Sequence, residues 1–137
     1  MKVFFDTSAF AKRYIEEPGS DEVARICLQA NQLVLSIICL PELLSTLNRL
    51  VREKKLQPGE YQKTKGLIAV DLRDINVCNL TPEVISLTIQ CLEKATLRAM
   101  DAIHLACALV TEPDLFVSSD QRQITAARRM GLKVVEV

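Results

Sequence analysis

The sequence is poor in the side chains that several kinds of site need. It has no Trp and only 4% aromatic residues, which argues against a platform of exposed rings that stacks the bases of single-stranded nucleic acid. It has one His and no Cys-x-x-Cys pair, so a zinc site lacks ligands. Its five cysteines are scattered and odd in number, which is typical of free thiols. We therefore expect a protein of the reducing cytoplasm.

Long apolar runs and an excess of one charge are missing as well. No segment approaches the ~18 apolar residues of a membrane span, and the apolar run at the N-terminus is too short for a signal peptide. The 17 basic and 17 acidic residues cancel, whereas proteins that bind nucleic acid by neutralising phosphates usually carry a basic excess. Any such binding must depend on metal ions or on local patches of basic residues. Six basic residues are candidates for such a patch: Lys12, Arg13, Arg49, Arg52, Lys54 and Lys55. Taken singly they are typical of solvated helix ends, and together they suggest a rim that steers RNA.

The pattern along the chain is an alternation of short apolar runs with segments of helical periodicity. The length fits one domain over residues 1–137. We predict strands at 3–5, 33–36, 77–80, 115–118 and 133–137. We predict helices at 8–16, 20–30, from between 37 and 41 to about 54, 60–72, 82–94, 100–110 and 121–130. The alternation is typical of a five-stranded parallel sheet with helices on both faces, a three-layer α/β/α sandwich.

Some helix ends carry a chemical signature. Ser20 is expected to cap the second helix, and Thr81, followed by Pro82, is expected to cap the fifth. Pro58 and Gly59 are expected to interrupt the chain before the fourth helix, and Gly131 is expected to end the last one.

Four acidic residues stand where chemistry is expected in such a sheet. Ligands bind outside the carboxyl ends of parallel strands, and Asp6 and Asp120 each follow a predicted strand. Glu42 lies near the first turn of the third helix, and Asp101 lies in the first turn of a helix that is otherwise almost wholly apolar. An acid in such a place must pair, cap a helix or bind a cation. Converging carboxylates repel one another unless a cation compensates, and Mg²⁺ or Mn²⁺ suits oxygen ligands and can activate water.

Each acid could instead have a structural role that involves no shared site. Asp6, Asp101 and Asp120 could cap the helices that follow them, and Glu42 could be a favourable acid in a first turn. Taken singly, capping or solvation is the favoured interpretation for any one of these residues. The combination of the four acids is what favours a shared site.

This combination and its local sequence resemble the PIN-domain family, in particular the VapC-like toxins of toxin–antitoxin pairs. The segment 97–106 is the most specific match, because it fits the pattern L-x-x-x-D-A-x-H-L-A around Asp101. The order and spacing agree along the whole chain, and four motifs together are specific where one is weak. The other matching stretches are 3–8, 36–42, and 116–120 followed by 126–127, 131–132 and 134–135.

The resemblance implies a strand order 3-2-1-4-5 and hydrolytic cleavage of RNA by a magnesium-dependent endoribonuclease. It implies Mg²⁺ or Mn²⁺ held mainly by the acids, with Ser8 and Ser118 as supporting residues. It further implies homodimers and a small antitoxin protein that blocks the site. The metal ligands and catalytic residues would be Asp6, Glu42, Asp101 and Asp120.

Two further residues of the matching segment have alternative roles. His104 lies on an apolar helix, which favours a core or supporting position over direct metal ligation. Arg98 could pair with an acid or contact phosphate or antitoxin, but most lone arginines are solvated surface residues.

Two competing interpretations remain. A phosphatase of the haloacid dehalogenase type also has an Asp after its first strand, but it needs a second Asp two positions later, where this chain has Ser8, and no glycine-rich phosphate loop is present. The second alternative is a catalytically silent PIN-like module that binds RNA or protein. Zero net charge keeps that alternative open, and metal-dependent turnover distinguishes the two.

Overall fold

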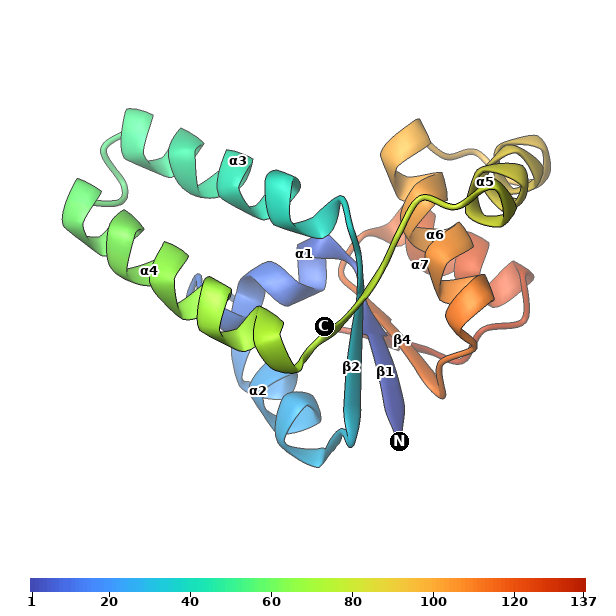
Figure 1. Cartoon of the computed structure of the whole chain (residues 1–137), viewed down its shortest axis with the longest axis horizontal. Helices are drawn as coiled ribbons and strands as arrows, with labels where there is room; N and C mark the ends of the chain where they lie inside the picture. Colours follow the sequence, from blue (N-terminus) through green and yellow to red (C-terminus); the bar gives the residue numbers. More distant parts are fainter.

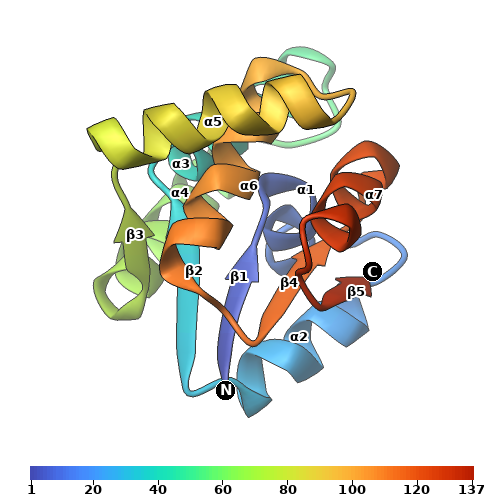
Figure 2. The ribbon, with the colours of Figure 1, turned by 90° about the vertical axis from the view of Figure 1, so that its right-hand side faces the viewer.

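A five-stranded parallel sheet forms the centre of the computed structural model, which describes all residues 1–137 (Figures 1 and 2). The strand order is β3-β2-β1-β4-β5 and every neighbouring pair is parallel. The predicted sheet and its order 3-2-1-4-5 are therefore confirmed. The strands are β1 (Lys2–Phe5), β2 (Gln32–Ser36), β3 (Asn76–Cys78), β4 (Leu115–Ser118) and β5 (Val134–Glu136).

Helices cover both faces of the sheet, as predicted. One face is covered by α1 to α4 and the other by α5 to α7, so the two layers lie on opposite sides of the sheet in Figure 1. The α-helices are α1 (Thr7–Phe10), α2 (Ser20–Gln29), α3 (Cys39–Arg52), α4 (Pro58–Asp71), α5 (Pro82–Lys94), α6 (Ala99–Thr111) and α7 (Gln121–Arg129). Two short 3-10 helices, η1 (Ala11–Arg13) and η2 (Leu72–Asp74), follow α1 and α4. None of the helices combines the length and the apolar character that crossing a bilayer requires.

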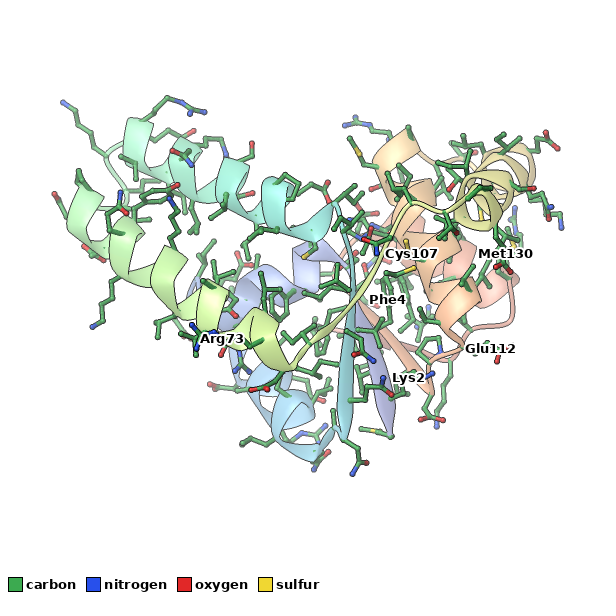
Figure 3. All side chains as sticks on the ribbon, in the orientation of Figure 1. Lys2, Phe4, Arg73, Cys107, Glu112 and Met130 are labelled. Carbon is green, nitrogen blue, oxygen red and sulfur yellow. The ribbon has the colours of Figure 1, made fainter.

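Alternating side chains of β1 divide between the two cores. Val3 and Phe5 pack in the core under α1 to α4, whereas Phe4 packs in the core under α5 to α7. Phe4 stacks on Phe116 of β4 with ring centroids 5.7 Å apart and shares its core with Cys107 of α6 (Figure 3). Each fully buried Phe contributes about 1.5–3 kcal/mol. Burial on both faces explains why this strand is a continuous apolar run.

Three predictions about helix ends were wrong in more than a shift of one or two residues. The first helix is short, because α1 ends at Phe10 and continues only as η1. The N-cap of α2 is Gly19, at a φ of 98°, and a Cβ there would lie 2.8 Å from the carbonyl carbon of Val137. The Ser20 hydroxyl instead accepts from the Glu17 N–H, so its predicted capping role was wrong. Pro58 and Gly59 belong to the first turn of α4 and do not interrupt it.

Other local predictions are confirmed. Thr81 caps α5 by accepting from the Val84 N–H at 3.2 Å, with Pro82 at the first helical position. Gly131 follows α7 with a φ of 88°. All the cysteines are free; Cys27 and Cys78 are half-buried and the others are buried.

Candidate active site

Asp6 and Asp120 lie at the same end of the sheet because their strands are neighbours. β1 pairs with β4, and the Asp6 N–H continues the ladder by donating to the Val117 carbonyl at 3.1 Å. Each acid is also an N-cap: Asp6 accepts from the Ala9 N–H at 2.9 Å, and Asp120 accepts from the Gln123 N–H at 3.0 Å. The capping interpretation is correct for both residues, and it coexists with their placement at the edge where ligands bind.

Two serines hold the Asp6 carboxylate. Ser8 donates to Oδ1 at 2.7 Å and Ser118 donates to Oδ2 at 2.5 Å. The same hydroxyls reach the other strand exit, since Ser8 accepts from the Ser119 N–H and Ser118 accepts from the Asp120 N–H. Both predicted supporting residues therefore contact the first acid, and they tie the exits of β1 and β4 into one network.

Asp6 is a buried carboxylate with no cationic partner. Its exposed fraction is 0%, and no Lys or Arg forms an ion pair with it. Burial raises the pKa of Asp6 above its usual value, although hydrogen bonds from Ser118, Ala9 and Ser8 act in the opposite direction. Negative charge at this position is therefore held at a free-energy cost that the local hydrogen bonds only partly offset.

Glu42 is held by two side chains from other elements. His104 Nε2 lies 2.5 Å from Glu42 Oε1, and the Thr7 hydroxyl donates to the same oxygen at 2.7 Å. Partial burial raises the pKa of Glu42, but the hydrogen bonds from His104 and Thr7 outweigh it and leave that pKa below its usual value. Glu42 lies in the first turn of α3, so its contacts are those of an ionised, oriented carboxylate.

His104 is a supporting residue in the core, which is the position that its place on an apolar helix predicted. Its exposed fraction is 1%, and its Nε2 also lies 3.1 Å from the Thr7 hydroxyl. Its Nδ1 is buried without a partner. The ring is therefore oriented by Glu42 and Thr7 alone.

Asp101 is the third residue of α6 and is not the cap of that helix. The N-cap is Arg98, which makes no side-chain capping bond. The Arg98 backbone N–H does act on the Asp101 carboxylate and lowers its pKa, so Asp101 supports the start of the helix from its first turn and not from the cap position. The carboxylate is half-buried and accepts from Gln123 Nε2 at 3.3 Å. Burial raises the pKa of Asp101, and the neighbouring charges of Asp120 and Glu42 raise it further.

The four acids have no Lys or Arg partner, but they do not form a closed metal shell. No three acid, His or Cys side chains are close enough together to hold one ion. The donor chemistry nevertheless fits a hard cation, because all four predicted ligands are carboxylates and none pairs with Lys or Arg. Mutual repulsion that raises the pKa of Asp101 is what a bound cation would relieve.

Three of the four acids line cavities, whereas Asp6 is fully buried and lines neither of them. A groove of about 830 Å³ lies beside Glu42, and Lys12 and Arg49 are among its lining residues. A second cavity of about 400 Å³ is lined by Asp101 and Asp120 together with Arg98, Gln121 and Arg122. Glu42 is therefore accessible from the first cavity, and Asp101 and Asp120 are accessible from the second.

The predicted basic rim is only partly at the site. Lys12 and Arg49 line the groove, but Arg13 pairs with Asp71, its Nε lying 3.1 Å from Oδ2. Tyr14 donates to the same carboxylate at 2.5 Å. The remaining three, Arg52, Lys54 and Lys55, line neither cavity beside the acids.

Sequence reasoning missed two residues of the site. The Thr7 hydroxyl donates to Glu42. The sequence signal for this residue was its position directly after Asp6, at the start of the helix that follows the first strand. Gln123 links Asp120 to Asp101 through its backbone and its side chain, and it is buried with an exposed fraction of 3%. A polar residue among the apolar positions of α7 was the only available signal.

Together, the fold and these side chains define a doubly wound α/β domain with an acidic site at the point where the strand order reverses. The sequence profile of the PIN domain family matches residues 3–129. The chain belongs to the PIN domain family.

Individual relatives agree with this assignment. The chain is 32% identical over 135 residues to ribonuclease VapC47 of Mycobacterium tuberculosis, covering 94% of this chain and 92% of the relative. The fold is similar to that of VapC20 of Mycobacterium tuberculosis, described as a sarcin–ricin loop cleaving toxin, with a TM-score of 0.72, 18% identity and 98% of each chain covered. It is similar also to a chain of a toxin–antitoxin complex from Klebsiella pneumoniae, with a TM-score of 0.72, 16% identity and coverage of 98% and 99%.

Proposed function

We propose that this protein is a metal-dependent endoribonuclease, the toxin of a toxin–antitoxin pair. The observation that carries the proposal is the set of four carboxylates without a Lys or Arg partner, in a chain 32% identical to a VapC ribonuclease. A carboxylate that is buried without a cationic partner, as Asp6 is, is destabilising in a free domain. Its retention fits a site whose charge is used with a cation and a phosphodiester.

The proposed metal is Mg²⁺ or Mn²⁺. When bound, it would activate water for attack on phosphorus and stabilise the leaving oxygen. Ser8 and Ser118 hold Asp6 in one orientation, and His104 and Thr7 hold Glu42. Hydrogen bonds that orient the ligands in this way are usual in metal sites. The proposed ligands are Asp6, Glu42, Asp101 and Asp120.

The partners of the relatives supply the rest of the proposal. Several solved structures with this fold are complexes with antitoxins, so a small antitoxin protein is the proposed regulator. We propose that the toxin forms homodimers and acts on RNA in the cytoplasm. Free thiols at all five cysteines suit that compartment.

The test is cleavage of RNA by the purified protein, freed of any partner. Wild type is incubated with mixed RNA in Mg²⁺, in Mn²⁺ and in EDTA, beside Asp6→Asn, Asp101→Asn and the exposed control Asp74→Asn. We expect cleavage with either metal, none in EDTA, none by the two site variants, and full activity of the control.

The opposite results separate the alternatives. Cleavage that ignores EDTA and both site substitutions would remove the carboxylate mechanism. Binding of RNA or of a protein partner without any metal-dependent turnover would instead identify the silent PIN-like module.

A further inference from the structure

A basic face of α7 leads away from the acids on the side opposite the large groove. Two cavities meet there and share Gln121 and Arg122: the 400 Å³ cavity beside Asp101 and Asp120, and a neighbouring cavity of about 290 Å³. The second cavity continues to Arg129 and to the residues 95 and 96 that join α5 to α6. A polar path therefore runs from the acids along α7.

Helical geometry explains the path. Residues 122, 125, 126 and 129 recur at spacings of three and four, so they lie on one face of the helix. All four line the second cavity. Arg122 and Arg129 are separated by seven residues, which corresponds to a rise of about 10.5 Å along the axis.

The arginines on this path are free to bind an anion. Arg98 and Arg122 make no ion pair and no side-chain hydrogen bond, although both line a cavity with two carboxylates. Arg129 donates only to the Lys94 carbonyl, at 3.3 Å through Nη1, which leaves most of its guanidinium donors free. Acids and arginines side by side without pairing are suited to a ligand that brings both a cation and an anion.

We propose that Arg98, Arg122 and Arg129 form a subsite for the sugar–phosphate backbone of the RNA strand on the α7 side of the acids. This inference rests on the proposed ribonuclease function and adds the path of the substrate. Guanidinium groups bind phosphate oxygens through paired donors, which suits them to such a path.

The composition of the two cavities favours phosphate over other ligands. No hydrophobic residue lines the cavity beside the acids, and the only hydrophobic residues that line the second cavity are Ala95 and Ala126. The core of a protein interface is apolar, so this path is poorly suited to a protein partner. No aromatic side chain lines either cavity, so there is no ring on which a base could stack. The contact is therefore with the backbone and does not read sequence.

The test measures binding separately from turnover. Anisotropy of a labelled single-stranded RNA of mixed sequence is followed in the Asp101→Asn background with Mg²⁺, over a series of KCl concentrations. Arg122→Gln and Arg129→Gln are compared with Arg128→Gln, which removes the same charge from the same helix outside both cavities. Arg122→Lys keeps the charge at the first position.

We expect each subsite variant to weaken binding about three- to tenfold and to lower the slope of log K against log salt by about 0.7. The loss should be equal for two unrelated sequences, Arg128→Gln should match the parent, and Arg122→Lys should keep the parental slope. Shortening the RNA from one end should abolish the Arg129 effect before the Arg122 effect, because Arg129 lies farther from the acids.

Several results would overturn the inference. Slopes for Arg122→Gln and Arg129→Gln equal to that of Arg128→Gln would exclude a phosphate subsite. A loss confined to one RNA sequence would indicate base recognition instead. Weakened capture of a protein partner with unchanged RNA binding would assign the arginines to an interface. Wild-type protein that cleaves no RNA would refute the proposed function alone, because the binding measurement does not depend on turnover.

Discussion

Replacing Asp6 by Asn is expected to make the protein more stable while abolishing its cleavage of RNA. The carboxylate is fully buried and has no cationic partner. An amide has nearly the same shape but carries no charge. The substitution therefore tests whether the acid is present for function at the expense of stability.

The structure allows the exchange of hydrogen bonds to be followed atom by atom. The amide oxygen can keep the two bonds that Oδ1 accepts from Ser8 and from the Ala9 N–H. The amide NH₂ then replaces Oδ2, so the Ser118 hydroxyl must accept where it now donates. Ser118 has a second lone pair for this, and its proton can turn toward the Ser8 hydroxyl, 3.5 Å away.

These changes set the size of the effect. All three bonds to the carboxylate lose their charge assistance, which costs about 1 kcal/mol for each bond, but burial still outweighs these bonds in its effect on the pKa of Asp6. The effective desolvation penalty of a buried ion is several kcal/mol, so we expect a net gain of about 1–3 kcal/mol. For a domain of this length that corresponds to a rise in Tm of about 4–12 °C.

Thermal unfolding followed by circular dichroism in EDTA at neutral pH gives the first measurement. Asp74→Asn makes the same chemical change at an exposed residue and should leave Tm within about 1–2 °C of wild type. Added Mg²⁺ should then raise the Tm of wild type and not that of Asp6→Asn, since a ligand that binds only the folded state stabilises it. A Tm for Asp6→Asn at or below that of wild type in EDTA would refute this account of the buried charge.

Three further predictions concern residues around the site. His104→Ala leaves Glu42 without its main partner and should lower cleavage about 10–100-fold and stability by about 2–4 kcal/mol, measured by turnover and by urea unfolding. Gln123→Leu removes a buried unpartnered carbonyl and should leave Tm unchanged or higher while raising the Mg²⁺ concentration for half-maximal activity, because Asp101 loses a donor; a lower Tm would contradict this. Burial raises the pKa of Asp71, but the hydrogen bonds from Tyr14 and Arg13 outweigh it and leave that pKa below its usual value. The bonds therefore stabilise the folded state above the unfolded pKa of about 3.9, and this stability should be lost as pH falls through the lower folded pKa. The advantage of wild type over Asp71→Asn in urea should therefore disappear at acid pH, and an advantage that grows on acidification would be evidence against it.

Features governed by neighbouring residues could be predicted from the sequence. The cap at Thr81 and the strand 115–118 depend on a hydroxyl before a proline and on a short apolar run, and both occur as predicted. The placement of Asp6 and Asp120 followed from a general property of parallel sheets. Local chemistry was misleading at Ser20, where Gly19 occupies the cap because the chain end at Val137 leaves no room for a side chain.

Features governed by distant contacts could not be predicted. The bond between His104 and Glu42 joins residues 62 apart, and no periodicity reveals it. The bond from Gln123 to Asp101 crosses between two helices in the same way. Both contacts decide how an acid is oriented, so the sequence indicates which acids share the sheet edge but not what holds each of them.

Zero net charge does not conflict with RNA binding once the charges are placed in the fold. Carboxylates occupy the centre of the site, while Arg98, Arg122 and Arg129 lie on one flank and Lys12 and Arg49 on the other. Exposed charges are screened beyond about 8 Å at physiological salt. An RNA strand at the site would therefore interact with these local groups and hardly with the net charge of the protein. The few phosphates that they contact set the salt dependence of binding. If the proposed function holds, RNA should therefore bind weakly except where the RNA strand crosses the acids between the two flanks.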